Sequence, residues 1–168
     1  MQSVNDKYEL EWTALRAVLE RYGQRLTDLY RANMRESGRP ASGALADSLR
    51  TEVVVGERTI AVDLSLLDYW KYIEHGTRPH WPPVDAIREW IRVKPVLPRP
   101  DAKGKLPTPN QLAYLIGRKI SLEGTQGKDD LSRALQQTWE EFAQAVADAV
   151  TADVTADLDW IMRTWLVA

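Results

Sequence analysis

The side chains with catalytic or metal-binding chemistry gather between positions 74 and 85, where the chain carries Glu74, His75, His80 and Asp85. This segment holds both histidines of the protein. A zinc site would need the two imidazoles together with two carboxylates, but the prolines between them leave no fixed face on which four ligands could converge. We therefore predict no metal site. The simpler interpretation is that His75 is a turn residue near an interface and that His80 is an exposed loop residue.

The sequence also lacks the common catalytic and cofactor motifs. No Gly-x-Ser-x-Gly elbow is present to expose a nucleophilic serine. The phosphate-cradling patterns Gly-x-x-x-x-Gly-Lys-Ser/Thr and Gly-x-Gly-x-x-Gly are missing too. We expect a protein that is not an enzyme and that needs no cofactor.

Length and composition restrict the class of protein further. The 168 residues predict a single domain over 1–168 with a core of its own. The formal net charge of −2 disfavours DNA as the primary ligand. Without cysteine the chain forms no disulfide, which suits a reducing cytoplasm. No stretch approaches the roughly 18 apolar residues of a membrane span, and the first residues lack a signal-peptide pattern, so we expect a soluble, unexported protein.

A long N-terminal helix is predicted over residues 5–36. Large apolar residues recur there in steps of three and four, which keeps them on one face of a helix. They are Tyr8, Trp12, Leu15, Leu19, Tyr22, Leu26 and Leu29. This apolar stripe needs a partner, either another helix of the same chain or a helix of a neighbouring subunit, and the intrachain core is the simpler interpretation.

The central region, 40–127, combines a hairpin, short helices and a proline-rich loop. Apolar residues alternate with polar ones over 50–66 around a turn at 56–58, which predicts an antiparallel hairpin with Val53, Val55, Ile60, Val62 and Leu64 on one face. Pro82 and Pro83 open a short helix that ends before Pro95. The breaker-rich stretch 94–109 is a surface loop. Thr108 then caps a further helix, which stops at the glycines of 123–127.

The C-terminal region, 129–168, has a second long helical pattern. Leu131, Leu135, Trp139, Phe142, Val146 and Val150 form its apolar stripe. Threonine and aspartate at 151–157 lower helix propensity, so we expect a kink or a split there. The predicted fold is α+β, with a small antiparallel β-sheet packed against long N- and C-terminal helices.

The stretch 69–79 is the most distinctive in the chain. Gly76 tolerates positive φ and Thr77 can bond to nearby backbone, so the pair predicts a sharp change of direction after a compact aromatic segment. Glu74 is expected to pin this turn by accepting hydrogen bonds from backbone N–H groups, or by pairing with Arg78 or Arg88. Its target lies either on the body of the protein or on a neighbouring subunit.

The tryptophans divide between core and surface. Trp12 and Trp139 fit the core stripes, whereas Trp81 lies between prolines and is either an exposed anchor for a partner or buried under its own loop. The residues expected to form a protein interface or a structural turn are Tyr72, Glu74, His75, Gly76, Thr77, Arg78 and Trp81.

Residues 69–77, Tyr-Trp-Lys-Tyr-Ile-Glu-His-Gly-Thr, resemble the Y-x-x-Y-I/V-E-x-G-T signature of the neck and tail-component (tail-completion) proteins of long-tailed bacteriophages. Residues 42–49 resemble that family's S/T-G-x-L-x-x-S-L segment, which precedes a pair of strands. Residues 112–127 resemble the A-x-x-I-x-x-K-I-x-x-x-G-T close of its larger members. The resemblance covers about residues 40–130, and His75 departs from it because the family usually has an aromatic residue there.

The resemblance implies a structural virion protein of the head-to-tail junction, made in the host cytoplasm. Such a protein assembles with itself into a sixfold or twelvefold ring around the DNA channel, with non-specific contact to packaged DNA. Its partners are the portal-side adaptor or stopper and the tail terminator or tail tube, with no membrane. Two alternatives stay open: a tail terminator, and a cytoplasmic helical adaptor or assembly chaperone that binds one partner through the apolar stripe.

Overall fold

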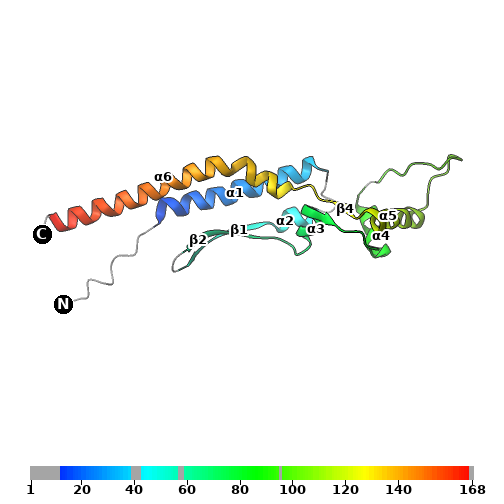
Figure 1. Ribbon diagram of the computed structural model, residues 1–168, viewed down its shortest axis with the longest axis horizontal. Coiled ribbons are helices and arrows are strands. Elements are labelled where there is room, and N and C mark those ends of the chain that lie inside the picture. The colour runs from blue at the N-terminus through cyan, green and yellow to red at the C-terminus, as the bar shows by residue number, and fades with distance from the viewer. Residues whose placement is uncertain (1–11, 39–42, 57–58, 95, 167–168) are drawn as a thin grey trace. The chain divides into compact units, whose positions relative to one another are not determined.

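The computed structural model describes residues 12–38, 43–56, 59–94 and 96–166 (Figure 1). It confirms the α+β prediction, with long helices near both ends of the chain and two small antiparallel sheets. The chain divides into two compact units. Unit 1 comprises Met1–Leu29, Arg50–Ser65 and Ala134–Ala168, and unit 2 comprises Tyr30–Leu49 and Leu66–Arg133.

Unit 1 is a helix pair with a hairpin. It contains most of α1 (Thr13–Glu36) and of α6 (Asp130–Leu166), and the strands β1 (Arg50–Gly56) and β2 (Thr59–Ser65). The strands pair antiparallel with Val53 opposite Val62. Figure 1 shows the hairpin and α6 running alongside α1, and their apolar residues pack on a shared core of Leu15, Val18, Leu19 and Ala149.

The predicted stripe of α1 is largely buried in this core. Leu15, Leu19 and Leu26 are buried and Trp12 packs against the core, while the charged residues between them are exposed. The part of the predicted helix before residue 12, including Tyr8, lies outside the described residues, as does the hairpin turn at 57–58. The intrachain interpretation of this stripe is therefore confirmed for the described part of α1.

Gly23 lets the hairpin approach α1 closely. A Cβ atom at this position would stand 3.0 Å from the side chain of Thr51 and 3.4 Å from Val62. These separations are tighter than ordinary packing, so the absence of a side chain sets how near β1 and β2 come to the helix.

Three residues expected in the core of α6 and the hairpin are exposed, among them Leu135 at 39%. Trp139 is 60% exposed and not part of the core stripe, which is a correction. Phe142 takes the inner place, because its ring stacks on Tyr22 with centroids 3.8 Å apart, and Trp139 lies against Phe142 from outside. Val55, predicted on the covered face of the hairpin, is also exposed.

Of the two expectations for the C-terminal helix, a kink or a split, the split is absent, because α6 is one helix of 37 residues. Three of the residues that lower helix propensity here make hydrogen bonds. The hydroxyls of Thr151 and Thr155 donate to the carbonyls of Ala147 and Thr151, at 2.8 and 2.7 Å. The buried carboxylate of Asp153 accepts hydrogen bonds from the N–H groups of Ala14 and Leu15, both at 2.9 Å. Because first-turn N–H groups lack partners within their own helix, Asp153 caps α1.

Unit 2 holds the shorter elements. They are α2 (Ala44–Ser48), α3 (Trp70–His75), β3 (Gly76–Thr77), α4 (Val84–Val93), α5 (Pro109–Glu123) and β4 (Thr125–Gln126). The helix after Pro82 and Pro83 and the helix capped by Thr108 are confirmed, the latter with a capping box to Gln111 and Pro109 at its first position. Residues 96–107 form no helix or strand, as predicted.

The packed face of α5 consists of small residues. Ala113 and Gly117 are buried, and Ile87 of α4 would meet a Cβ at Gly117 at 3.3 Å. Leu115, predicted on the apolar side of this helix, is exposed. Small side chains at the contact let α4 and α5 pack closely, so the larger apolar residues are left at its margins.

We predict that Asp153→Ala lowers the free energy of unfolding by about 2 kcal/mol, because two buried N–H groups lose their acceptor. Urea denaturation followed by circular dichroism measures this loss. Asp148→Ala is the matched control, since Asp148 is an exposed aspartate on the same helix. Equal stabilities for the two variants would refute the cap.

Candidate functional site

Glu74 is the best-buried carboxylate of the signature segment, with 1% of its surface exposed. Its Oε1 atom accepts hydrogen bonds from the N–H groups of Leu131 and Ser132, at 2.8 and 2.9 Å. Its backbone carbonyl accepts two more, from Lys128 and Asp129, at 3.0 and 3.2 Å. Glu74, near the end of α3, therefore accepts hydrogen bonds from the two residues just before α6 and from two residues in its first turn.

The physical basis is the positive end of a helix. Leu131 and Ser132 lie in the first turn of α6, where N–H groups have no partner within the helix and a negative charge is favoured. Of the two predicted roles, bonding to backbone is what the structure contains. Arg88 instead pairs with Asp85 at 3.1 Å, and the carbonyl of Arg78 accepts a hydrogen bond from His80 Nδ1 at 2.9 Å.

The end of α1 holds the start of α6 from within the same unit. Asn33 donates to the carbonyl of Asp130 at 3.0 Å, and Ser37 donates to its carboxylate at 2.8 Å. Arg133 lies 3.2 Å from Glu36 and 3.4 Å from Asp130. The first turn of α6 is thus fixed by α3 and by α1 together.

Two helices end in the same way beside Glu74. Gly76 caps α3 with φ 76° and Gly124 caps α5 with φ 72°, and each is followed by threonine. Thr77 and Thr125 then pair antiparallel as β3 and β4, and their hydroxyl oxygens lie 3.0 Å apart. We call this arrangement the glycine–threonine junction, made of residues 76–77 and 124–127.

The junction depends on close backbone approach as well as on positive φ. A Cβ at Gly76 would overlap the carbonyl oxygen of Thr125, and a Cβ at Gly124 would overlap that of Thr77. A Cβ at Gly127 would overlap the carbonyl oxygen of Glu74. The predicted turn at Gly76 and Thr77 is therefore present. Besides the positive φ, the close approach of the opposite backbone leaves no room for a side chain at Gly76.

The structure brings only part of the predicted site together. Glu74, Gly76 and Thr77 meet at the junction. His75 lies at its edge, exposed, with Nδ1 3.8 Å from Asp129 Oδ1. Trp81 is 51% exposed and rests against Tyr114, with ring centroids 5.7 Å apart. The remaining predicted residues, Tyr72 and Arg78, are exposed.

An apolar groove of about 530 Å³ lies beside the junction. We call it the junction groove. Its walls come from α3, α4, α5 and β4, with Lys94 and Lys128 among its lining residues. The apolar residues that line it are Tyr72, Ile73, Ala86, Ile87, Trp90, Ile116 and Ile120.

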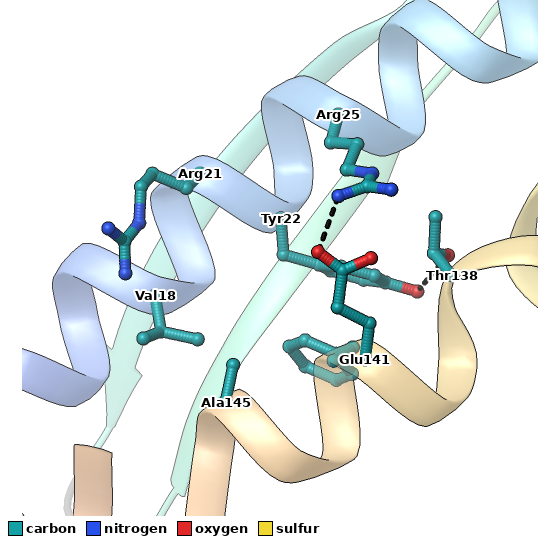
Figure 2. A pocket seen from close by; sticks show the side chains of 8 residues that line it. Val18, Arg21, Tyr22, Arg25, Thr138, Glu141 and Ala145 are labelled. Atoms are coloured by element: carbon teal, nitrogen blue, oxygen red, sulfur yellow. Dashed lines mark hydrogen bonds and ion pairs between the residues drawn. The ribbon is translucent and has the colours of Figure 1, made fainter. Parts of the chain in front are cut away.

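A second hollow, of about 380 Å³, lies between α1 and α6 in unit 1 (Figure 2). Two pairs of its polar groups interact. Arg25 Nη1 lies 2.6 Å from Glu141 Oε1, and the hydroxyl of Thr138 donates to that of Tyr22 at 3.4 Å. The arrangement braces the helix pair and presents no nucleophile beside a base.

No cluster of three metal-ligating side chains occurs in the described part of the chain. None of the described helices is long and apolar enough to cross a membrane. Comparisons with protein families, with curated proteins and with solved structures find no match to this chain.

Sequence reasoning missed the second half of the junction. Residues 123–127 predict the end of a helix and resemble the closing motif of the phage family, but nothing in their spacing identifies β3 as their partner or the first turn of α6 as the partner of Glu74. The available signal was the repetition of Gly-Thr at the ends of two predicted helices, at 76–77 and 124–125.

We predict that Glu74→Ala lowers the free energy of unfolding by about 3 kcal/mol, because two first-turn N–H groups lose a charged acceptor in a buried position. Urea denaturation measures the change. The control is Glu123→Ala, which removes an exposed glutamate just before Gly124. If the two variants are equally stable, Glu74 does not hold α6.

We predict that Gly76→Ala prevents unit 2 from folding normally, whereas Gly104→Ala is tolerated. Both glycines have positive φ, of 76° and 77°, so alanine is strained at either position. Only at Gly76 would the new Cβ collide with backbone, because nothing lies within 4 Å of one at Gly104. Size-exclusion chromatography and thermal unfolding of both proteins make the comparison, and equal behaviour would refute the close approach.

Proposed function

We propose that this chain is a structural protein of the bacteriophage head-to-tail junction, a neck or tail-completion protein that assembles as a ring around the DNA channel. The observation that carries the proposal is the glycine–threonine junction. It pairs the signature that ends at Thr77 with the closing motif at Gly124 and Thr125, which lie 48 residues apart. These two segments carry the resemblance to the phage family, and they form one structural feature.

The third segment of the resemblance supports the same proposal. Residues 44–48 form α2 in the same unit, with Leu45 and Leu49 buried, and the strand pair of β1 and β2 follows directly. That order of a short segment before two strands is the one that the resemblance implies. The three segments thus occur in the expected order and two of them are in contact.

The distribution of charge and apolar surface fits a ring component. Large apolar side chains are exposed on α4, α5 and α6, which suits a protein that completes its surface by assembly. A net charge of −2 avoids tight phosphate binding, which suits a wall along which DNA must slide. A ring with sixfold or twelvefold symmetry would meet the portal-side adaptor or stopper on one face and the tail terminator or tail tube on the other.

Immunogold electron microscopy of purified particles tests the proposal, with antibody raised to this chain. We expect label at the point where head meets tail. Particles from a mutant phage that lacks the chain serve as the negative control. Label absent from intact particles and from dissociated virions would contradict a virion role and favour the cytoplasmic adaptor or assembly chaperone.

The same mutant phage separates the two virion candidates. Loss of a neck or tail-completion protein should leave filled heads and tails of normal length that do not join. Because a terminator stops growth of the tail tube, overlong tails would contradict the neck assignment and identify a tail terminator.

A further inference from the structure

The last part of α6 carries an apolar stripe without a cover among the described residues. Val154, Leu158, Met162 and Trp165 recur in steps of four, four and three, so they share one face of the helix. All four are exposed, Leu158 at 54% and Trp165 at 66%. We call this face the terminal stripe.

Exposure of this kind indicates an interface. Isolated apolar residues on a surface need no explanation, but a contiguous row with tryptophan and methionine is the composition of protein–protein contacts. The terminal stripe lies on a different face of α6 from Phe142, Val146 and Val150, which contact the core of unit 1. Each step of four residues turns the row by about 40°, so by Leu158 and Met162 the row has left the face that packs on α1.

The charges beside the terminal stripe are acidic. Residues 154–166 contain two aspartates, Asp157 and Asp159, and one arginine, Arg163, which lies 4.0 Å from Asp159. Asp157 and Asp159 stand next to Leu158 and flank the stripe, because neighbouring residues on a helix point about 100° apart. A surface that accepts this helix should be apolar along its floor and basic at its sides.

The junction groove has these properties. Its floor is apolar, and its two charged lining residues are both lysines, Lys94 and Lys128. Lys94 lies 5.5 Å from the centre of the Trp90 ring and donates to the carbonyl of Gly38 at 2.7 Å, so its position is fixed from two sides. Lys128 is exposed.

We propose that the terminal stripe of one copy of this chain docks in the junction groove of the next copy. The two surfaces are different, so the contact is heterologous: each copy donates a helix end and accepts another, and a suitable rotation closes the series into a ring. This inference deepens the proposed function and rests on its self-assembly. It names the residues that would join one ring subunit to the next.

Cysteine cross-linking tests the contact directly, because the chain has no cysteine of its own. Met162→Cys and Gln126→Cys are made in separate chains, mixed, and treated with a short bismaleimide. Gln126 lines the groove and is exposed. We expect a covalent dimer from the mixture, and a ladder of longer products when both cysteines are placed in one chain.

The matched control replaces Met162→Cys by Ala156→Cys. Ala156 is exposed on the same stretch of α6 but lies on the side away from the terminal stripe. We expect its yield of dimer with Gln126→Cys to be at least tenfold lower. Circular dichroism of each variant verifies that the fold is kept.

Three results would overturn the docking. An equal yield from Ala156→Cys would show random collision. Dimers of Met162→Cys alone, without a groove cysteine, would indicate symmetric pairing of two α6 helices. Absence of the mixed dimer would exclude the contact. Light scattering of the unmodified chain then shows whether it forms oligomers at all. If it does, the proposed self-assembly stands but uses another interface.

Discussion

The arrangement of unit 2 depends on one buried carboxylate at the start of a long helix. Glu74 sits two residues before the glycine that ends α3, and its side chain and carbonyl together bind four N–H groups at residues 128, 129, 131 and 132. Because the first turn of a helix attracts negative charge, this contact fixes the first turn of α6, which belongs to unit 2, relative to α3. Once that is set, the backbone of β3 must pass against β4, and only glycine fits at 76, 124 and 127. Asp153 uses the same device in unit 1, where it holds the corresponding first-turn groups of α1.

Local features of this fold were predictable from sequence, and long-range partners were not. The stripe of α1, the strand pairing and the helix cap at Thr108 follow from spacing and residue type within a few positions, and all three are present. The partner of Glu74 lies 57 residues away, and spacing carries no information over that distance. The same limit applies to Trp139 and to α6. Periodicity places Trp139 in the core, but it is Phe142 that stacks on Tyr22 there. Helix propensity is a local property, so it does not reveal that Asp153 caps another helix.

The distinctive residues of this protein hold its own backbone and helices in place. In the part of the chain that the structure describes, Glu74 Oε1 accepts from backbone N–H groups, the hydroxyl of Thr77 lies 3.0 Å from that of Thr125, and an ion pair between Arg25 and Glu141 lines the hollow of unit 1. What stays available is apolar surface: the junction groove, the terminal stripe and the rings around Trp81. A ring component needs this combination, since rigid junctions hold each subunit in shape while uncovered apolar faces join it to its neighbours.

Amide hydrogen exchange read by NMR is the most direct test of the central claim that Glu74 holds α6. The N–H groups of Leu131 and Ser132 should exchange slowly, although first-turn groups ordinarily exchange fast. The equivalent groups of α4, at Asp85 and Ala86, provide the internal reference, because the N-cap of α4 makes no side-chain hydrogen bond. We predict exchange at least tenfold slower at Leu131 and Ser132 than at Asp85 and Ala86. Equal rates at the two helix starts would contradict the account.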